Sequence, residues 1–143
     1  MESYNPDEAL KLRNQLCFPL YTAARKLTQE YTPFLKPLGL TYTQYIVMLV
    51  LWEKDGITVG ELGRELMLDN GTLTPLLKKL ETAGIITRTR RREDERQVIL
   101  NLTEEGRELK KTAREVPLKL SGCVKLNPDE AMQLYQLLYK IIQ

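Results

Sequence analysis

The sequence of 143 residues contains no histidine, and this absence excludes several kinds of chemistry. A metal site with histidine ligands and a nucleophile activated by a histidine base are both impossible without it. Hydrophobic runs are short, and none approaches the roughly 18 residues of a membrane-spanning helix. The opening stretch MESYNPDEAL is polar and acidic, unlike a signal peptide. We therefore expect a cytoplasmic protein with no membrane partner, no metal site and no cofactor.

Cysteine is scarce, and Cys17 and Cys123 are the only two thiols. Stable disulfides are rare in the cytoplasm, so such a pair is expected to be transient, redox-sensing or unpaired. Cys17 lies in RNQLCFPLY, within a segment whose pattern predicts an apolar helix face. On that pattern alone, an inert core cysteine is the more common outcome.

The sequence also has no large excess of charge of one sign, since 21 Lys and Arg face 19 Asp and Glu for a net charge of +2. Any site for nucleic acid must therefore come from local clustering of basic residues. The content of 43% hydrophobic and 28% charged residues is ordinary for a soluble protein with a packed core. The length predicts a single domain, residues 1–143.

A long helix is predicted from Pro6 to about Phe34, with Pro19 expected to bend it. Its apolar face is marked by a seven-residue spacing of Leu10, Cys17, Ala24 and Tyr31. A break at PLGLTYTQ follows, with Thr43 as a candidate cap. The segment QYIVMLVLWEKDG is apolar on nearly all sides, which predicts a central helix that ends at Gly56.

Two short helices joined by a tight turn are predicted next. Thr58 and Glu61 form a T-x-x-E capping box that opens the first. After the turn LDNG, a second helix carries leucines on one face and ends at Gly84, with Pro75 tolerated only near its start. This arrangement is a helix-turn-helix.

Beyond Gly84 the hydrophobic period changes to two, which predicts strands IITRTR and QVILNL joined by the charged tip RREDE. A two-stranded hairpin directly after a helix-turn-helix is a wing. Thr103 is predicted to cap a helix broken near Pro117, and the motif NPDE starts the last helix at Asn127. The expected fold class is mainly α with a small β-hairpin wing, a winged helix-turn-helix.

The middle of the chain predicts double-stranded DNA as the partner. The second short helix begins with small polar groups, and the wing concentrates arginines suited to phosphates and to the minor groove. The alternative is a solvated, salt-bridged hairpin on an unrelated helical domain, but the cap spacing, the helix pair and the wing all favour DNA. The residues expected to contact it are Asn70, Thr72, Thr74, Lys78, Arg88, Arg90, Arg91, Arg92 and Arg96.

A homodimer is expected because one winged helix contacts only half of a palindromic site. The apolar stripes of the terminal helices, about residues 6–35 and 104–143, would pair two copies around the DNA-binding region of about residues 43–102. Alternatively, these helices fold back onto their own subunit.

The motifs NQLCFPLY, GLTYTQY, LDNGTLTPLLKKLE, GIITR and EDERQV resemble the MarR family of winged-helix repressors, over essentially the whole chain. Within that family they resemble the OhrR-type sensors of organic hydroperoxides. The resemblance implies a dimeric repressor, not an enzyme, that binds a palindromic operator when reduced. It also implies that organic hydroperoxide oxidises Cys17 to a sulfenic acid, whereupon the operator is released.

By the same resemblance, Cys17 matches the peroxidatic cysteine, and Tyr31 and Tyr42 match tyrosines whose hydroxyls bond the thiolate across the dimer interface. Cys123 places the chain with the two-cysteine members, in which the second cysteine comes from the other subunit. The resemblance adds Asp69 to the DNA-facing segment and implies that Asp94 orients Arg96 in the wing.

Geometry supports a role for the partner subunit. Cys17 and Tyr31 lie about 21 Å apart along one helix, so they cannot touch within a chain. An antiparallel crossing with the partner's helix could bring Tyr31 to Cys17. A hydroxyl donor favours thiolate over thiol.

Three other functions are compatible with parts of this pattern. A MarR-type repressor could be released by a small aromatic ligand, with the cysteines incidental. A thiol peroxidase would turn over hydroperoxide catalytically, although it would need neither wing nor recognition helix. An architectural DNA-binding protein would have no switch.

Overall fold

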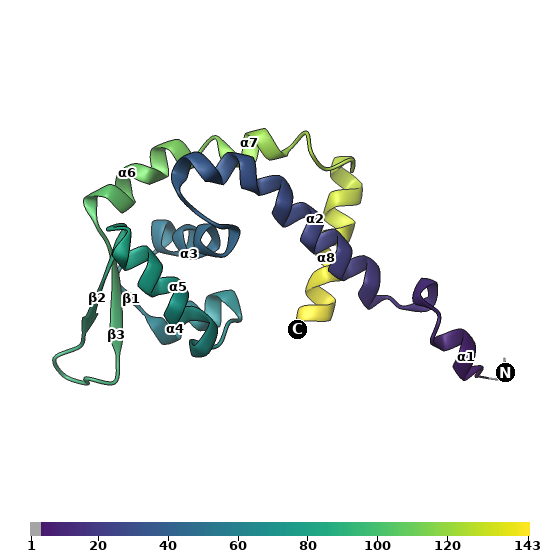
Figure 1. Ribbon diagram of the computed structural model, residues 1–143, viewed down its shortest axis with the longest axis horizontal. Helices are drawn as coiled ribbons and strands as arrows, with labels where there is room; N and C mark the ends of the chain where they lie inside the picture. The colour runs from purple at the N-terminus through teal and green to yellow at the C-terminus, as the bar shows by residue number, and fades with distance from the viewer. Residues whose placement is uncertain (1–3) are drawn as a thin grey trace.

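The computed structural model describes residues 4–143 and confirms a mainly helical winged helix-turn-helix (Figure 1). The N-terminal half contains α1 (Pro6–Ala9), the 3-10 turn η1 (Leu12–Asn14), α2 (Cys17–Leu35), η2 (Lys36–Leu38), α3 (Tyr42–Glu53), β1 (Ile57–Thr58) and α4 (Val59–Leu66). The chain continues with α5 (Asn70–Thr82), β2 (Ile86–Arg90), β3 (Val98–Leu102), α6 (Glu104–Ala113), α7 (Val116–Leu120) and α8 (Pro128–Ile142).

The first predicted helix is interrupted, and this changes the position of Cys17. The chain forms α1 and η1 before α2 begins at Cys17, so the thiol lies in the first turn of a helix and not in its middle. Pro19 explains the boundary. Its ring would clash with the carbonyl of Gln15 in a continuous helix, whereas in a first turn its missing N–H has no partner to lose.

Helix α3 forms the centre of the fold, as predicted, but its cap is Thr41 and not Thr43. The Thr41 hydroxyl accepts from the backbone N–H of Gln44, and the Gln44 side chain accepts from the backbone N–H of Thr41 at 2.9 Å. This reciprocal pair is a capping box, which requires Gln or Glu three residues after the cap. The buried face of α3 includes Tyr45, Val47, Met48 and Leu51.

The sheet has three strands in the order β1-β3-β2, not the two predicted. The additional strand β1 pairs antiparallel with β3 through Ile57 opposite Leu100. Because it has only two residues, it shows no alternation of apolar and polar positions that a sequence pattern could detect. It ties the start of α4 to the base of the wing.

The helix-turn-helix is confirmed as α4 and α5. Thr58 and Glu61 form the predicted capping box of α4, and the turn after α4 places Met67 in the left-handed region at φ 54°. Pro75 lies in the second turn of α5, further inside than expected.

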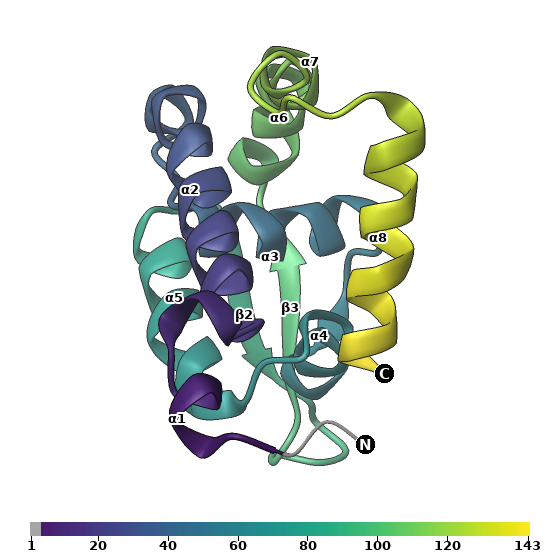
Figure 2. The ribbon, with the colours of Figure 1, turned by 90° about the vertical axis from the view of Figure 1, so that its right-hand side faces the viewer.

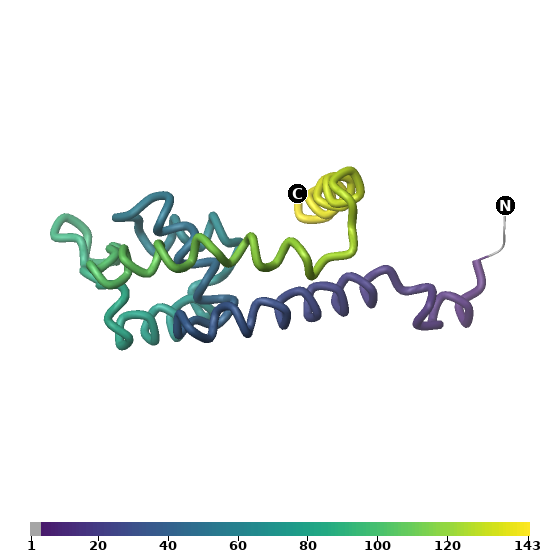
Figure 3. Tube along the Cα trace, turned by 90° about the horizontal axis from the view of Figure 1, so that it is seen from above, coloured from purple at the N-terminus to yellow at the C-terminus, as the bar shows by residue number. Residues whose placement is uncertain are grey.

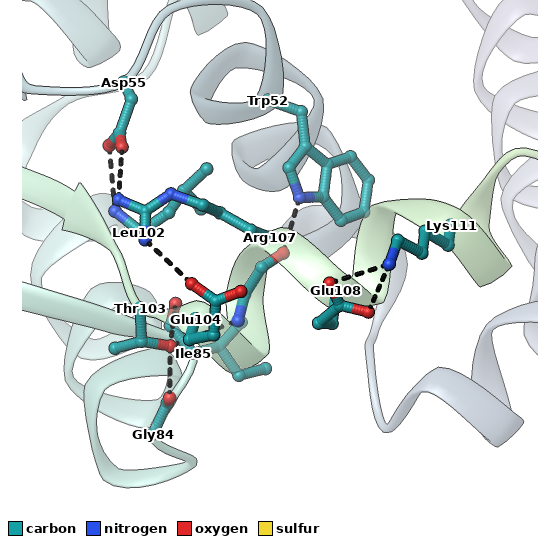
Figure 4. A network of polar contacts seen from close by, with 11 residues as sticks. Trp52, Asp55, Gly84, Ile85, Leu102, Thr103, Glu104, Arg107, Glu108 and Lys111 are labelled. Atoms are coloured by element: carbon teal, nitrogen blue, oxygen red, sulfur yellow. Dashed lines mark hydrogen bonds and ion pairs between the residues drawn. The ribbon is translucent and has the colours of Figure 1, made fainter.

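A polar network joins the end of α3 to the wing and to α6 (Figure 4). The Trp52 indole donates to the carbonyl of Gly106 at 2.8 Å, and a carboxylate oxygen of Asp55 accepts from the backbone N–H of Leu102 at 2.8 Å. The other oxygen of Asp55 lies 3.4 Å from the guanidinium of Arg107. These contacts connect α6 directly to α3, and Asp55 connects both helices to β3.

Gly106 is the tightest position of this junction. A Cβ at Gly106 would lie 2.2 Å from the carbonyl oxygen of Ile85, which belongs to the backbone and cannot move aside. We expect Gly106→Ala to lower the free energy of unfolding by about 1–3 kcal/mol, as measured by chemical denaturation. Gly122→Ala is the matched control, because no atom lies within 4 Å of its Cβ position. Equal stability of the two variants would contradict the packing argument.

The terminal helices lie at the periphery of the chain. As predicted, α8 starts with a capping box between Asn127 and Glu130, and the helix before it is broken near Pro117, since α6 ends at Ala113 and α7 begins at Val116. Figures 2 and 3 show α8 standing apart from α2, and Figure 1 shows α1 extending away from the rest of the chain. No residue of α8 is buried.

Among residues 4–143, no single helix is long and apolar enough to cross a membrane. One pair, α2 extended by η2 together with α3, meets the same criteria of length and composition, but it is bent by 69°.

Candidate nucleic-acid interface and redox site

The start of α5 is shaped by Asp69. One of its carboxylate oxygens accepts from the backbone N–H of Thr72 at 2.8 Å, and the other accepts from the Thr72 hydroxyl at 3.1 Å. These bonds hold the pKa of Asp69 below its ordinary value. The hydroxyl of Thr74 donates to the carbonyl of Asn70 at 2.7 Å, and the exposed Asn70 side-chain amide forms no hydrogen bond within residues 4–143. The contact between Asp69 and Thr72 thus fixes the N-terminal end of α5, next to the Asn70 and Thr74 side chains.

A groove of about 490 Å³ separates α4 and α5 from the wing, and it collects several of the predicted residues. Asn70 and Thr74 line one side, and Arg88 and Arg96 line the other. Lys78 is exposed further along α5 and does not line it. The sequence analysis did not single out Arg64 and Gln97, which also line the groove.

The wing arginines differ in what they contact. Arg88 is paired with Glu81 of α5 at 2.7 Å, and Arg91 donates to the Gln97 side chain at 3.0 Å and lies 3.6 Å from Glu93. Within residues 4–143, no acidic side chain forms an ion pair with the remaining three: Arg90, Arg92 and Arg96. These three exposed guanidinium groups carry the uncompensated positive charge of the wing.

Asp94 acts on Arg96 through the backbone. Its carboxylate accepts from the Arg96 N–H at 3.1 Å, and the Gln97 N–H donates to the Asp94 carbonyl at 3.0 Å. In the protein alone, the contact between Asp94 and Arg96 is thus made through the backbone, within a turn that fixes the tip of the hairpin. The Arg96 side chain remains exposed.

The two cysteines are free and exposed. Cys17 is flanked by large apolar side chains that are also exposed, with Leu16 at 69% and Phe18 at 45% of their full exposure. The interpretation of Cys17 as an inert core residue is therefore wrong for the isolated chain. Cys123 lies in the connection between α7 and α8, where its thiol is 3.9 Å from the carbonyl of Lys119.

Tyr31 and Tyr42 meet in an aromatic cluster, with ring centroids 4.9 Å apart. Tyr45, which the sequence analysis did not select, contacts Tyr31 at 5.7 Å and Trp52 at 6.5 Å. Burial, and secondarily the neighbouring Tyr42, raises the pKa of Tyr31 above its ordinary value. A tyrosine hydroxyl is already protonated at neutral pH, and the raised pKa extends to higher pH the range in which Tyr31 can donate to an anion. The spacing of Tyr42 and Tyr45, three residues apart on one helix, was the available sequence signal.

The structure does not bring Cys17 to these tyrosines within one chain. Cys17 begins α2, and Tyr31 lies near the opposite end of the same helix. A contact between them requires a second copy of the chain.

Known proteins resemble this chain over nearly its whole length. Residues 29–113 match the family described as transcriptional regulator SarA/Rot. The chain is 45% identical, over 97% of its length, to the organic hydroperoxide resistance transcriptional regulator of Bacillus subtilis strain 168, of which it covers 95%.

Solved structures of DNA-binding regulators also resemble this chain over nearly its whole length. Reduced AbfR bound to DNA, a protein known from Staphylococcus epidermidis, matches with a TM-score of 0.79 and 38% identity over 95% of this chain and 94% of that one. The disulfide form of AbfR matches less closely, at 0.66 with 39% identity over 96% of each chain. A mutant of MarR from E. coli with operator DNA matches at 0.78 with 26% identity, over 90% and 94% of the two chains. The arrangement of helices and wing described above thus occurs in proteins that hold DNA.

Proposed function

The chain belongs to the SarA/Rot family of MarR-type winged-helix transcriptional regulators, and from this premise we propose that it is a repressor released from its operator by organic hydroperoxide. It is a DNA-binding regulator and not an enzyme, which excludes the thiol-peroxidase alternative. The observation that carries the proposal is the exposed Cys17 thiol at the start of α2, in a chain 45% identical to a hydroperoxide-resistance regulator.

The proposed first step is oxidation of Cys17. Its thiolate sulfur attacks the outer oxygen of the hydroperoxide, an S–O bond forms, and the O–O bond breaks. The departing alkoxide takes a proton from water and becomes an alcohol. Cys17 is thereby oxidised by two electrons to a sulfenic acid, and the hydroperoxide is reduced.

A homodimer supplies the contact that one chain lacks. Helix α8 contributes no buried residue, and seven of its large apolar side chains are exposed: Met132, Leu134, Tyr135, Leu137, Tyr139, Ile141 and Ile142. The segment before α2 exposes Leu10, Leu12 and Leu16 as well. We infer that a second copy covers these surfaces and brings its Tyr31 and Tyr42 to Cys17, because the hydroxyls would then stabilise the thiolate.

The conformation of the chain resembles that of a DNA-bound relative. Its TM-score is 0.79 with reduced, DNA-bound AbfR, 0.78 with overoxidised, DNA-bound AbfR and 0.66 with disulfide-formed AbfR. Both cysteines are free in the chain. The arrangement of its elements is therefore closer to the DNA-bound form of that relative.

The proposal is tested by operator binding before and after oxidation. The probe is a palindromic duplex selected by the reduced protein from randomised duplexes, and binding is followed by fluorescence anisotropy. Stoichiometric cumene hydroperoxide is expected to weaken binding by about 5- to 150-fold, the usual range of a coupling between two sites. Unchanged affinity would contradict the redox switch. Failure to select any duplex, or equal affinity for a random one, would contradict the repressor itself.

Arg96 is expected to supply a phosphate contact from the wing. We expect Arg96→Ala to weaken binding to the selected duplex by about 1–3 kcal/mol. It should also reduce the slope of log affinity against log salt concentration by about one, as for the loss of one phosphate contact. Arg114→Ala, at the C-cap of α6 and outside the groove between α5 and the wing, is the control of equal charge and should change neither quantity. Unchanged affinity of Arg96→Ala at several salt concentrations would contradict the assignment of the wing.

A groove supports one second candidate, release by a small aromatic ligand. It has a volume of about 330 Å³ and is lined by Tyr45, Trp52 and Pro117, by the cations Lys110 and Arg114, and by one acid, Glu53. Aromatic walls with adjacent cations suit an aromatic carboxylate. Release of DNA by salicylate from a variant that lacks both cysteines would favour this mechanism over thiol oxidation.

A further inference from the structure

One ion pair joins the wing to the recognition helix. Arg88 lies on β2 and Glu81 near the end of α5, and both Nε and Nη2 of Arg88 donate to Oε2 of Glu81, at 2.9 and 2.7 Å. The two side chains are 28% and 38% exposed. In no other ion pair of residues 4–143 are both partners below 40% exposure.

The position of Arg88 on the strand makes this contact structurally important. Ile86 anchors the base of β2 in the core, and beyond it Arg88 is the only residue of the strand that is not exposed. The connection from α5 to β2 passes through Gly84, at φ 74°. Within residues 4–143, the Arg88–Glu81 pair provides the only side-chain hydrogen bonds and the only ion pair between β2 and α5.

The geometry of the pair suits a fixed spacing. A guanidinium that donates two N–H groups to one carboxylate is held in direction as well as in distance, which a lysine could not reproduce. Arg88 also lines the groove between Asn70 and Thr74 of α5 and Arg96 of the wing. It thus borders the same groove as the side chains that would contact DNA.

We propose that Arg88 and Glu81 are positioning residues that set the spacing between recognition helix and wing, and that Arg88 does not itself neutralise a phosphate. This inference rests on DNA binding by α5 and the wing, and it assigns Arg88 a role different from that of Arg96. A correctly spaced wing would favour the palindromic duplex, where helix and wing must engage together. Binding to random duplex depends on charge and would change little.

The test is a double-mutant cycle with reduced protein on the selected palindromic duplex. Glu81→Gln and Arg88→Gln are each expected to weaken binding about three- to tenfold. The double variant should bind no more weakly than the more affected of the two single variants, because both substitutions remove the same contact. The slope of affinity against salt should stay unchanged. If Arg88 instead contacts a phosphate, Arg88→Gln will flatten that slope, and Glu81→Gln will leave affinity intact or raise it by removing an acid near DNA.

Charge reversal separates positioning from folding. Glu81→Arg alone and Arg88→Glu alone are each expected to lower the ratio of affinity for the selected duplex to affinity for a random duplex. The double variant Glu81→Arg with Arg88→Glu keeps the net charge and is expected to recover much of that ratio. Thermal unfolding of every variant is recorded, and Glu108→Gln, which removes an exposed ion pair on α6, is the control. Loss of both affinities in proportion to stability would overturn the proposal. Wild-type protein that selects no duplex would instead overturn the proposed function.

Discussion

Replacing Cys17 with serine is expected to leave operator affinity of the reduced protein within about twofold and to abolish its loss on hydroperoxide treatment. Cys17 is exposed at the start of α2, far along the chain from α5 and the wing, so the substitution removes no DNA contact. Serine is close in size to cysteine, and its hydroxyl is not oxidised by a peroxide. The full coupling of about 5- to 150-fold should therefore disappear.

The measurement is anisotropy of the selected duplex during titration with cumene hydroperoxide, with Cys123→Ser treated in parallel. This second variant keeps the sensing thiol, so its Cys17 should still be oxidised to a sulfenic acid, which mass spectrometry detects as a dimedone adduct. A Cys17→Ser protein that still releases DNA would contradict thiol sensing and favour the ligand mechanism.

The tyrosine cluster gives a separate expectation about the rate of oxidation. A tyrosine hydroxyl is protonated at neutral pH and burial raises the pKa of Tyr31 further, so Tyr31 can donate to a thiolate of the partner subunit. Hydrogen bonds to charged groups contribute about 1.5–3 kcal/mol, so Tyr31→Phe should slow the reaction of Cys17 with hydroperoxide roughly tenfold or more. Stopped-flow measurement of thiol loss tests this, with Tyr4→Phe, at an exposed tyrosine outside α2, as the control. Equal rates would show that the hydroxyl does not reach the sulfur.

The sequence patterns predicted those elements whose boundaries have a local chemical cause. Thr58 with Glu61 and Asn127 with Glu130 are capping boxes, and both mark helix starts in the structure. The same rule would have selected Thr41 over Thr43, because only Thr41 has a glutamine three residues later. The start of α2 was missed because the seven-residue apolar spacing continues through Cys17, although the backbone is interrupted by the steric demand of Pro19.

The candidate site was predicted less completely because its contacts are tertiary. Counting arginines could not reveal that Arg88 is paired with Glu81 of another element, nor that Asp94 bonds the backbone of Arg96. Composition finds a basic wing, whereas only the fold shows which guanidinium groups are uncompensated. The proposed pairing of Cys17 with Tyr31 depends on a second chain, which no single-chain pattern specifies.

The second large effect concerns Cys123, which we propose resolves the sulfenic acid of Cys17 in the other subunit. A sulfenic acid persists only until a thiol reaches it, and condensation then forms an S–S bond and releases water. Cys123 is the only other thiol of the chain, and it lies exposed in the connection between α7 and α8, where no helix holds the backbone.

Formation of this bond would move backbone, and this links oxidation to release. A disulfide needs its two Cα atoms within about 7 Å. The Cys123 connection lies between α7, which packs on α2, and α8, which the second subunit is proposed to cover. Drawing Cys123 onto the partner's Cys17 would shift α7 and α6, and the bonds from α6 to Trp52 and Asp55 would carry that shift to the wing. The spacing of the two recognition helices would then change although no DNA-contacting residue is altered.

After hydroperoxide treatment, wild-type protein is therefore expected to migrate as a covalent dimer on a non-reducing gel and to return to monomer with reductant. Cys123→Ser should remain monomeric on that gel, because neither subunit then offers a resolving thiol. Ser121→Ala, in the same connection, is the matched control and should still form the dimer. An intramolecular Cys17–Cys123 peptide from a monomer band would refute exchange between subunits. A Cys123→Ser protein that dimerises covalently through Cys17 alone would refute any role for Cys123.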